Sequence, residues 1–387
     1  MKNIAIFCDG TWNNRDKTDS PTSVARLEEI VDVAKDNDGN GQKSHYQIGL
    51  GANDDVEGAA KFLDKFRGGA LGRGLTQDLR ECYEFLIETY APGDRIFIFG
   101  FSRGAYTARS FAGLIRAAGI PEEKKHIGAA MAWYRNRHKD THPNSDASHQ
   151  LRAQISPRVF TSNKERDWRT AQFMDTGQPV DIGYLGIFDT VGAHGIPGVL
   201  GQFRAVPGGH GFHDHDLSSL VRSGRHAMGL DETRVLYRPT KWSNLDELNR
   251  VLGKDDEGGL RYRQLWFPGD HGKIGGSGSE RRISNSVLEW IVEGARVAGL
   301  GAPLTSEVEA KADDYLGSLT NGGGFDPTGL IRWTRRGPGA GETDELHDVA
   351  KRRIVEVSSY RPGSLRRMLL DQASLADLQQ EHATRFA

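Results

Sequence analysis

The stretch Arg95-Ile-Phe-Ile-Phe-Gly-Phe-Ser-Arg-Gly-Ala-Tyr-Thr-Ala-Arg109 decides the fold of this 387-residue chain. Bulky apolar residues lead into the pattern Gly-x-Ser-x-Gly around Ser102, and small and apolar residues at helical spacing follow it. A strand, a sharp turn and a helix in this order are typical of a nucleophile elbow, which exposes a reactive serine at the end of a strand. Gly100 and Gly104 suit such a turn because they carry no Cβ atom. A turn of small residues with an incidental serine is the alternative interpretation.

Strands and helices alternate on both sides of this motif. Apolar runs predict strands, and apolar residues at helical spacing predict amphipathic helices. The predicted strands lie at 4–7, 46–50, 184–188 and 265–267, and the predicted helices at 24–34, 75–90 and 286–298. This alternation indicates an α/β fold of the α/β-hydrolase type, with a mainly parallel sheet and helices on both faces.

The rest of the chain is expected to be inserted into, or appended to, one domain over residues 1–387. Residues 120–180 are polar with weak periodicity, and residues 192–225 are rich in Gly and His, so both are interpreted as inserted cap or loop regions. Residues 322–387 are interpreted as a C-terminal extension that packs on the core.

The inserted regions are expected to cover Ser102 and to gate an apolar groove. Ile196, Val199, Leu200 and Phe203 would then line the inner face of that cap. The alternative is that these four side chains pack on the sheet, as apolar loop residues usually do.

Composition excludes several classes of protein. The chain has 50 Lys and Arg against 52 Asp and Glu, so its net charge of −2 predicts no nucleic-acid partner. Its two cysteines form no Cys-x-x-Cys pair and are expected to be buried thiols. No apolar run approaches the length of about 18 residues needed to span a bilayer. The N-terminus enters a strand without a signal-peptide pattern, which predicts synthesis in the cytoplasm and, if the protein is exported, a signal-independent route.

A serine nucleophile needs a base and an orienting carboxylate, which follow it in the order acid, then histidine, in this fold. Asp189 directly follows one predicted strand and His271 lies just beyond another, so they are the best candidates. Asp189 as a helix cap or turn residue, and His271 as a loop histidine, are the alternatives. If Asp189 is not the acid, Asp270 and Asp9 are the next candidates.

An oxyanion hole requires two backbone N–H groups near the serine. The N–H of Arg103, directly after Ser102, supplies the first. Gly10 and Thr11 follow the first strand and are expected to supply the second, with Asp9 bracing their loop. A plain Asp-Gly turn is the equal alternative there.

Five segments together resemble the α/β-hydrolase domain of type VI secretion phospholipase effectors. They are Phe-Cys-Asp-Gly-Thr-Trp-Asn (7–13), Gly-Ala-Leu-Gly-Arg-Gly (69–74), Gly-Phe-Ser-Arg-Gly-Ala-Tyr-Thr-Ala-Arg (100–109), Phe-Asp-Thr-Val (188–191) and Trp-Phe-Pro-Gly-Asp-His (266–271). Residues 225–234 and 237–240 also match that pattern. The resemblance implies a triad of Ser102, Asp189 and His271 and hydrolysis of phospholipid acyl esters.

The chain departs from the pattern at one position beside the base. The family usually has an aspartate two residues after the histidine, where this chain has Lys273. The missing carboxylate puts the orientation of the base and the substrate preference in doubt, so ester hydrolysis is a firmer expectation than phospholipid specificity.

Other motifs point to other chemistry but are incomplete. A haloacid-dehalogenase nucleophile would fall at Phe7, which is no carboxylate. The His- and Asp-rich run at 210–216 breaks a metallo-hydrolase pattern at the last two positions of that pattern. It is interpreted as a solvated loop, with a divalent-metal site as the alternative. The glycine-rich run at 68–74 lacks the residues of a nucleotide-binding loop. The arginines at 331–336 and 352–353 are interpreted as a structural or solvated face, with contact to anionic lipid head groups as the alternative.

The sequence therefore predicts a serine esterase, most specifically a phospholipase A-like enzyme that works through an acyl-enzyme. It predicts no metal and no cofactor. The expected partners are a lipid or other ester, a membrane surface, and a secretion or immunity protein. A carboxylesterase for soluble esters and a catalytically silent binding module are the alternatives, because a fold does not fix a function.

Overall fold

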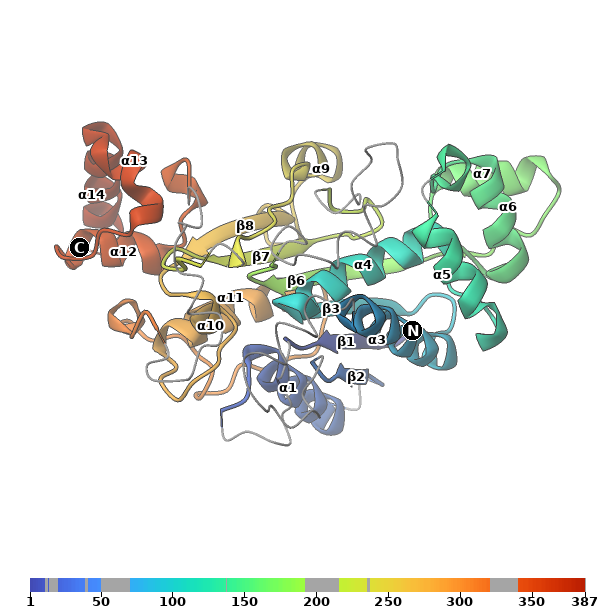
Figure 1. The fold of residues 1–387 in the computed structure, drawn as a ribbon, viewed down its shortest axis with the longest axis horizontal. Coiled ribbons are helices and arrows are strands. Elements are labelled where there is room, and N and C mark those ends of the chain that lie inside the picture. The colour runs from blue at the N-terminus through green and yellow to red at the C-terminus, as the bar shows by residue number, and fades with distance from the viewer. Residues whose placement is uncertain are drawn as a thin grey trace.

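The structure is a computed structural model that describes residues 1–10, 13, 20–38, 41–49, 70–136, 138–191, 216–234, 237–320 and 340–386. A six-stranded, wholly parallel sheet lies at its centre (Figure 1), in the order β2-β1-β3-β6-β7-β8. Its strands are β1 (Asn3–Cys8), β2 (Lys43–Gln47), β3 (Arg95–Phe101), β6 (Asp181–Phe188), β7 (Gly224–Gly229) and β8 (Tyr262–Phe267). The predicted α/β fold with a parallel sheet is confirmed.

Both faces of the sheet are covered, so its central strands are apolar throughout rather than alternating with polar residues. In β3, Ile96 and Ile98 belong to one core cluster, whereas Phe97 and Phe99 belong to another on the opposite face. The isoleucine face carries α3 (Ala70–Thr89), α4 (Arg103–Ala118), α5 (Ile127–Arg135) and α9 (Leu245–Leu252). The phenylalanine face carries α1 (Ser23–Asp38) and α11 (Arg282–Val297).

The strand order reverses between β1 and β3. The chain leaves β1 toward β2 on one side, whereas β3 leads on toward β6 on the other. Ligands of open parallel sheets bind at such a switch point, outside the carboxyl ends of the strands. Asp9 follows β1 and Ser102 follows β3, so both lie at this position.

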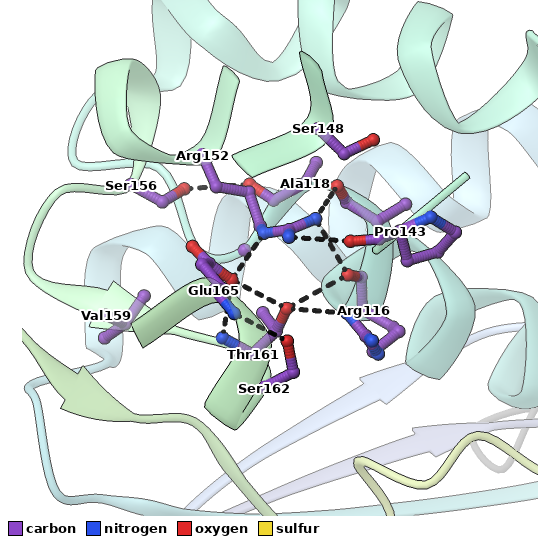
Figure 2. Close-up of polar contacts among 12 residues, drawn as sticks. Arg116, Ala118, Pro143, Ser148, Arg152, Ser156, Val159, Thr161, Ser162 and Glu165 are labelled. Atoms are coloured by element: carbon purple, nitrogen blue, oxygen red, sulfur yellow. Dashed lines mark hydrogen bonds and ion pairs between the residues drawn. The ribbon is translucent and has the colours of Figure 1, made fainter. Parts of the chain in front are cut away.

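Part of the inserted region 120–180 packs at the C-terminal end of the helix that follows Ser102. The region forms α5, α6 (Asp146–Ile155), α7 (Asn163–Ala171) and the short strands β4 (Val159–Phe160) and β5 (Gln178–Pro179). Arg152 of α6 donates to the carbonyl of Ala117 at 2.9 Å, and Ser156 donates to that of Ala118, as Figure 2 shows. These carbonyls end α4, about 24 Å along the helix from Ser102. Hence α6 and α7 do not cover the serine.

A buried ion cluster joins α6 and α7 to each other. Glu165 lies 2.7 Å from Arg152 Nε and 2.6 Å from Arg169 Nη2, and all three side chains have no exposed area. Burial alone would raise the pKa of Glu165, but the two arginines and the N–H of Thr161 outweigh it and hold that pKa below its usual value. Arg116 of α4 joins the cluster by donating to Thr161 (Figure 2).

The C-terminal residues 340–386 pack beyond the β8 edge of the sheet. They contain α12 (Asp348–Glu356), α13 (Arg366–Leu370) and α14 (Gln372–Phe386), and their apolar side chains cluster with Met228, Leu230 and Trp266. Figure 1 shows these helices at the opposite end of the molecule from α6 and α7.

The described residues also contain short helices outside these elements. They are α10 (His271–Ile274) and the 3-10 turns Lys124–His126, Lys139–Thr141, Asp314–Leu316, Thr343–Glu345 and Gly363–Leu365.

Several boundaries differ from the sequence prediction. The second strand ends at Gln47 rather than at residue 50, and the helix predicted at 286–298 begins at Arg282. β7 and α9 were not predicted, because Arg225 and His226 interrupt the apolar run of the strand and the helix is short. Cys8 and Cys82 are buried free thiols, as predicted. Within the described residues, no helix is both long and apolar enough to cross a membrane.

Candidate active site

Ser102 stands on a strained turn between β3 and α4. Its backbone φ is +57°, in the left-handed region that non-glycine residues avoid, and it precedes the first residue of α4. The turn is tight because α4 lies against β1: a Cβ atom on Gly104 would lie 2.0 Å from the carbonyl oxygen of Cys8. Such strain persists only where the surrounding structure enforces it, which is usual at functional sites.

The structure brings the three predicted side chains into hydrogen-bond contact. Ser102 Oγ lies 2.8 Å from His271 Nε2, and His271 Nδ1 lies 2.8 Å from Asp189 Oδ2. A serine hydroxyl can donate to Nε2 only in the tautomer that carries its proton on Nδ1, and that proton is then donated to the carboxylate. The arrangement therefore orients the imidazole as a base for the serine.

Asp189 is held by backbone geometry as well as by the imidazole. It follows β6 with φ +39° and has no exposed area. Its second oxygen, Oδ1, accepts the N–H of Gly229 at 3.1 Å. A buried carboxylate needs such donors, since an unpaired buried charge is costly. Gly229 ends the strand that the sequence did not predict.

His271 begins the short helix α10 and lies between two aromatic rings. Asp270 caps this helix by accepting the N–H of Lys273 at 2.9 Å. The imidazole centroid is 4.7 Å from the ring of Phe101 and 4.6 Å from that of Tyr237. The two rings restrict the rotation of the imidazole, and no local sequence pattern indicates either contact.

Glu232 is a further residue of this site that the sequence analysis missed. It is buried, it accepts the backbone N–H of His271 at 3.3 Å, and it pairs with Arg234 at 2.6 Å. Burial acts to raise the pKa of Glu232, but hydrogen bonds and charge from Arg234 keep it below its usual value. The guanidinium of Arg234 lies 4.0 Å from the centre of the Tyr237 ring, so this ion pair supports both the backbone and the ring beside the imidazole.

Asp270 and Asp9 were the alternative candidates for the acid. Within the described part of the chain, neither carboxylate forms a hydrogen bond with the imidazole of His271. Asp270 caps α10. Asp9 accepts Gly10 N–H through Oδ1, and the hydroxyls of Thr22 and Tyr46 through Oδ2. Burial raises the pKa of Asp9 above its usual value, although these three donors act against the rise.

The expected oxyanion loop lies beside the elbow. A Cβ on Gly104 would also lie 2.5 Å from the carbonyl oxygen of Asp9, so this loop packs directly on the start of α4. Asp9 Oδ1 accepts the N–H of Gly10 at 2.6 Å, so this N–H is already engaged within the loop. Arg103 is the first residue of α4, where backbone amides point out of the helix end. Thr11 lies outside the described residues.

Lys273 does not reach the triad. Its side chain is almost fully buried, and its ammonium group donates to the carbonyl of Glu280 at 2.9 Å and to the carboxylate of the same residue at 3.0 Å. The substitution beside the base therefore leaves the contact between His271 and Asp189 in place.

Most of the other sequence motifs fall outside the part of the chain that the structure describes. Residues 210–215, 331–336 and the apolar residues expected to line a cap lie outside the described residues. Arg353 donates to the carbonyls of Tyr315 and Gly317, which favours its structural interpretation. Within the described ranges, no three His, Cys, Asp or Glu side chains are grouped so that they could hold a metal ion.

An open parallel sheet, a strained serine after β3 and a hydrogen-bonded Ser–His–Asp chain define the class as an α/β-hydrolase-like protein. Residues 2–294 match the family "T6SS, Phospholipase effector Tle1-like, catalytic domain". The chain belongs to this family, as the resemblance of its motifs predicted.

Individual relatives are more distant. "Uncharacterized protein YEL023C" of Saccharomyces cerevisiae is 28% identical over 246 residues, which are 61% of this chain and 32% of the yeast protein. An uncharacterized protein from Pseudomonas aeruginosa is 17% identical with a TM-score of 0.42, and the match covers 97% of this chain and 56% of that chain.

A structure of the Tle1 effector bound to the VgrG spike from the Type 6 secretion system is 19% identical with a TM-score of 0.32. That match covers 72% of this chain and 52% of the Tle1 chain. The chain thus spans about a third of the yeast relative and about half of each solved relative.

Proposed function

We propose that this protein is a serine hydrolase that cleaves acyl esters of phospholipids. The observation that carries the proposal is the continuous hydrogen-bonded chain from Ser102 through His271 to Asp189, set on a nucleophile elbow. The family to which the chain belongs is described as one of phospholipase effectors, and this supports a lipid ester as the substrate.

In the proposed reaction, Ser102 Oγ attacks the acyl carbonyl carbon while its proton passes to His271 Nε2. The tetrahedral intermediate collapses, His271 returns the proton to the leaving alcohol, and an acyl-enzyme remains. Water then repeats the same steps and releases the fatty acid. Asp189 orients the imidazole and stabilises its charged form.

We assign the oxyanion hole to the N–H of Arg103 and to the loop that begins at Gly10. Backbone donors at this point would stabilise the negative charge that develops on the carbonyl oxygen. The close packing of Asp9 on Gly104 supports the assignment, because it brings the start of that loop beside the elbow.

The substrate class is tested with the purified full chain, phosphatidylethanolamine vesicles and p-nitrophenyl butyrate. We expect fatty acid release from vesicles, lowered by a factor of about 10³ or more in Ser102→Ala. Rapid cleavage of p-nitrophenyl butyrate without fatty acid release from vesicles would identify the protein as a carboxylesterase for soluble esters and not a phospholipase. No cleavage of either substrate by the folded protein would favour a silent binding module.

We also propose export by a type VI secretion system, because the family is one of its effectors. A partner on the secretion apparatus and an immunity protein in the producing cell would follow from that route. The proposal is tested by asking whether the chain is found outside cells only while the secretion apparatus is intact.

A further inference from the structure

A cavity of about 450 Å³ lies along α4. Ser102, Asp189 and His271 are not among the described residues that line it. Its wall on α4 extends from Arg109 to Ala117, which is about 12 Å of helix. Arg109 is itself about 10 Å along the helix from Ser102. The facing walls come from residues 134, 136, 138–139, 141–144 and 216–219, and from Leu185 and Trp242. The volume is in the range of small-molecule binding sites.

The inner surface of this cavity is largely apolar. Ala112, Ala117, Leu185, Leu217 and Trp242 all line it, and each is buried within the protein. A surface of this kind favours a hydrocarbon chain, because burying apolar area on binding removes it from water.

Positive charge lies on the same walls. Arg109, Arg116 and Lys139 line the cavity, whereas Asp216 is its one acidic lining residue within the described part of the chain, and that carboxylate already accepts a hydrogen bond from Ser243. Lys139 is exposed at the rim and forms no ion pair with a described residue. Burial lowers the pKa of Arg116 to about 10, which leaves it charged at neutral pH.

The far end of the cavity is built rigidly. Arg116 donates to Asn144 and, at 2.9 Å, to Thr161, while Arg152 donates to the carbonyl of Pro143 at 2.8 Å. Figure 2 shows Pro143 and Arg116 beside the guanidinium of Arg152. The loop that closes the cavity is thus held by the ion cluster, so a ligand would meet a preformed wall.

We propose that this cavity binds a fatty acid, with its hydrocarbon chain against the apolar wall and its carboxylate near the basic side chains. This proposal depends on the proposed function in one respect: phospholipid deacylation would produce the fatty acid that binds. Binding itself requires no hydrolysis, and the cavity is a second site beside the reaction centre.

The experiment uses full-length protein with Ser102→Ala and calorimetric titration with dodecanoate below its micelle concentration. Ser219 is exposed and lines the cavity, so Ser219→Trp should obstruct its mouth. We expect binding that Ser219→Trp weakens at least ~10-fold, because the indole displaces the chain from its apolar wall. Ser318→Trp is the matched control, since Ser318 is exposed and does not line the cavity. Circular dichroism checks that both variants fold.

A second arm tests the charge. Lys139→Glu should weaken dodecanoate binding by roughly 5-fold, as expected for the loss of an exposed charge pair. It should leave the binding of dodecanol, which has the same chain and no charge, almost unchanged. Absence of dodecanoate binding, or equal binding by Ser219→Trp and Ser318→Trp, would overturn the proposal. If dodecanoate binds but the wild-type protein does not hydrolyse vesicles, the proposed fatty acid site stands and only the proposed phospholipase activity is rejected.

Discussion

Asp189 shows most directly how single residues define this site. Its carboxylate is fully buried, and its two oxygens are used by the imidazole of His271 and the N–H of Gly229. Both donors come from elements that follow Asp189 in the chain, on β7 and α10. Asp189 can therefore make both contacts only when the carboxyl half of the sheet is assembled.

Replacing Asp189 with asparagine should abolish most catalysis while keeping the fold. The amide can donate to Nδ1 and thereby favour the wrong imidazole tautomer, which costs about 10⁴ in kcat in a serine protease. We expect a loss of that order for vesicle hydrolysis, with little change in KM. Asp270→Asn is the control, because asparagine caps helices as well as aspartate does. Full activity of Asp189→Asn would assign the acid elsewhere.

The sequence was informative for residues that directly follow strands. Ser102 and Asp189 could be predicted because strand ends meet at one edge of a parallel sheet. Glu232, Phe101 and Tyr237 could not, because their roles depend on contacts with His271 made across the fold. No local pattern marks a ring or a carboxylate that supports another residue.

Among the elements, the unit of β3, the elbow and α4 carries the tightest packing. The start of α4 lies directly on the end of β1, where Gly104 leaves no room for a Cβ atom. That contact sets the distance between the nucleophile and the loop that begins at Asp9.

Gly104→Ala should destabilise the protein although alanine is the better helix former. The added Cβ would lie 2.0 Å from a backbone oxygen of Cys8, so β1 and α4 must separate. We expect the free energy of unfolding in urea to fall by about 3 kcal/mol, as in other overpacked cores. Gly128→Ala in α5 is the matched control, since no atom lies within 4 Å of its added Cβ. It should stabilise by about 0.5–1 kcal/mol. Equal effects of the two substitutions would contradict this account of the packing.

The inserted region 120–180 was expected to form a cap. Its buried residues combine the ion cluster of Arg152, Glu165 and Arg169 with scattered apolar side chains such as Met131 and Ile155, so its hydrophobic periodicity is weak. Polar composition therefore led to a cap interpretation, whereas the helices pack at the far end of α4.

In the molecule as a whole, buried ionisable groups outside the active site make stability depend on pH. Asp78 of α3 is buried beside Gln47 and Glu81, and burial, followed by the charge of Glu81, raises its pKa to about 7. An aspartate in the unfolded chain has a pKa of about 3.9. The stability associated with protonated Asp78 is complete below that value and is lost as the pH rises through about 7.

Asp78→Asn should consequently gain stability relative to the wild type as the pH rises. Between pH 5 and pH 8.5 we expect the difference in unfolding free energy to change by about 2 kcal/mol in favour of the variant. Urea unfolding at both pH values measures it. Glu257→Gln, at an exposed position, should show no such trend. A pH-independent difference for Asp78→Asn would mean that the carboxyl is charged throughout this range.

The central claim is that Ser102 is an activated nucleophile, and covalent labelling tests it most directly. The full chain is treated with a fluorophosphonate probe, and the modified peptide is identified by mass spectrometry. We expect one labelled residue, Ser102, because a serine hydrogen-bonded to an oriented imidazole reacts where ordinary serines do not. Ser110→Ala, which removes a buried hydroxyl from the same helix, should label normally. Labelling that persists in Ser102→Ala, or a folded wild-type protein that takes up no probe, would contradict the account.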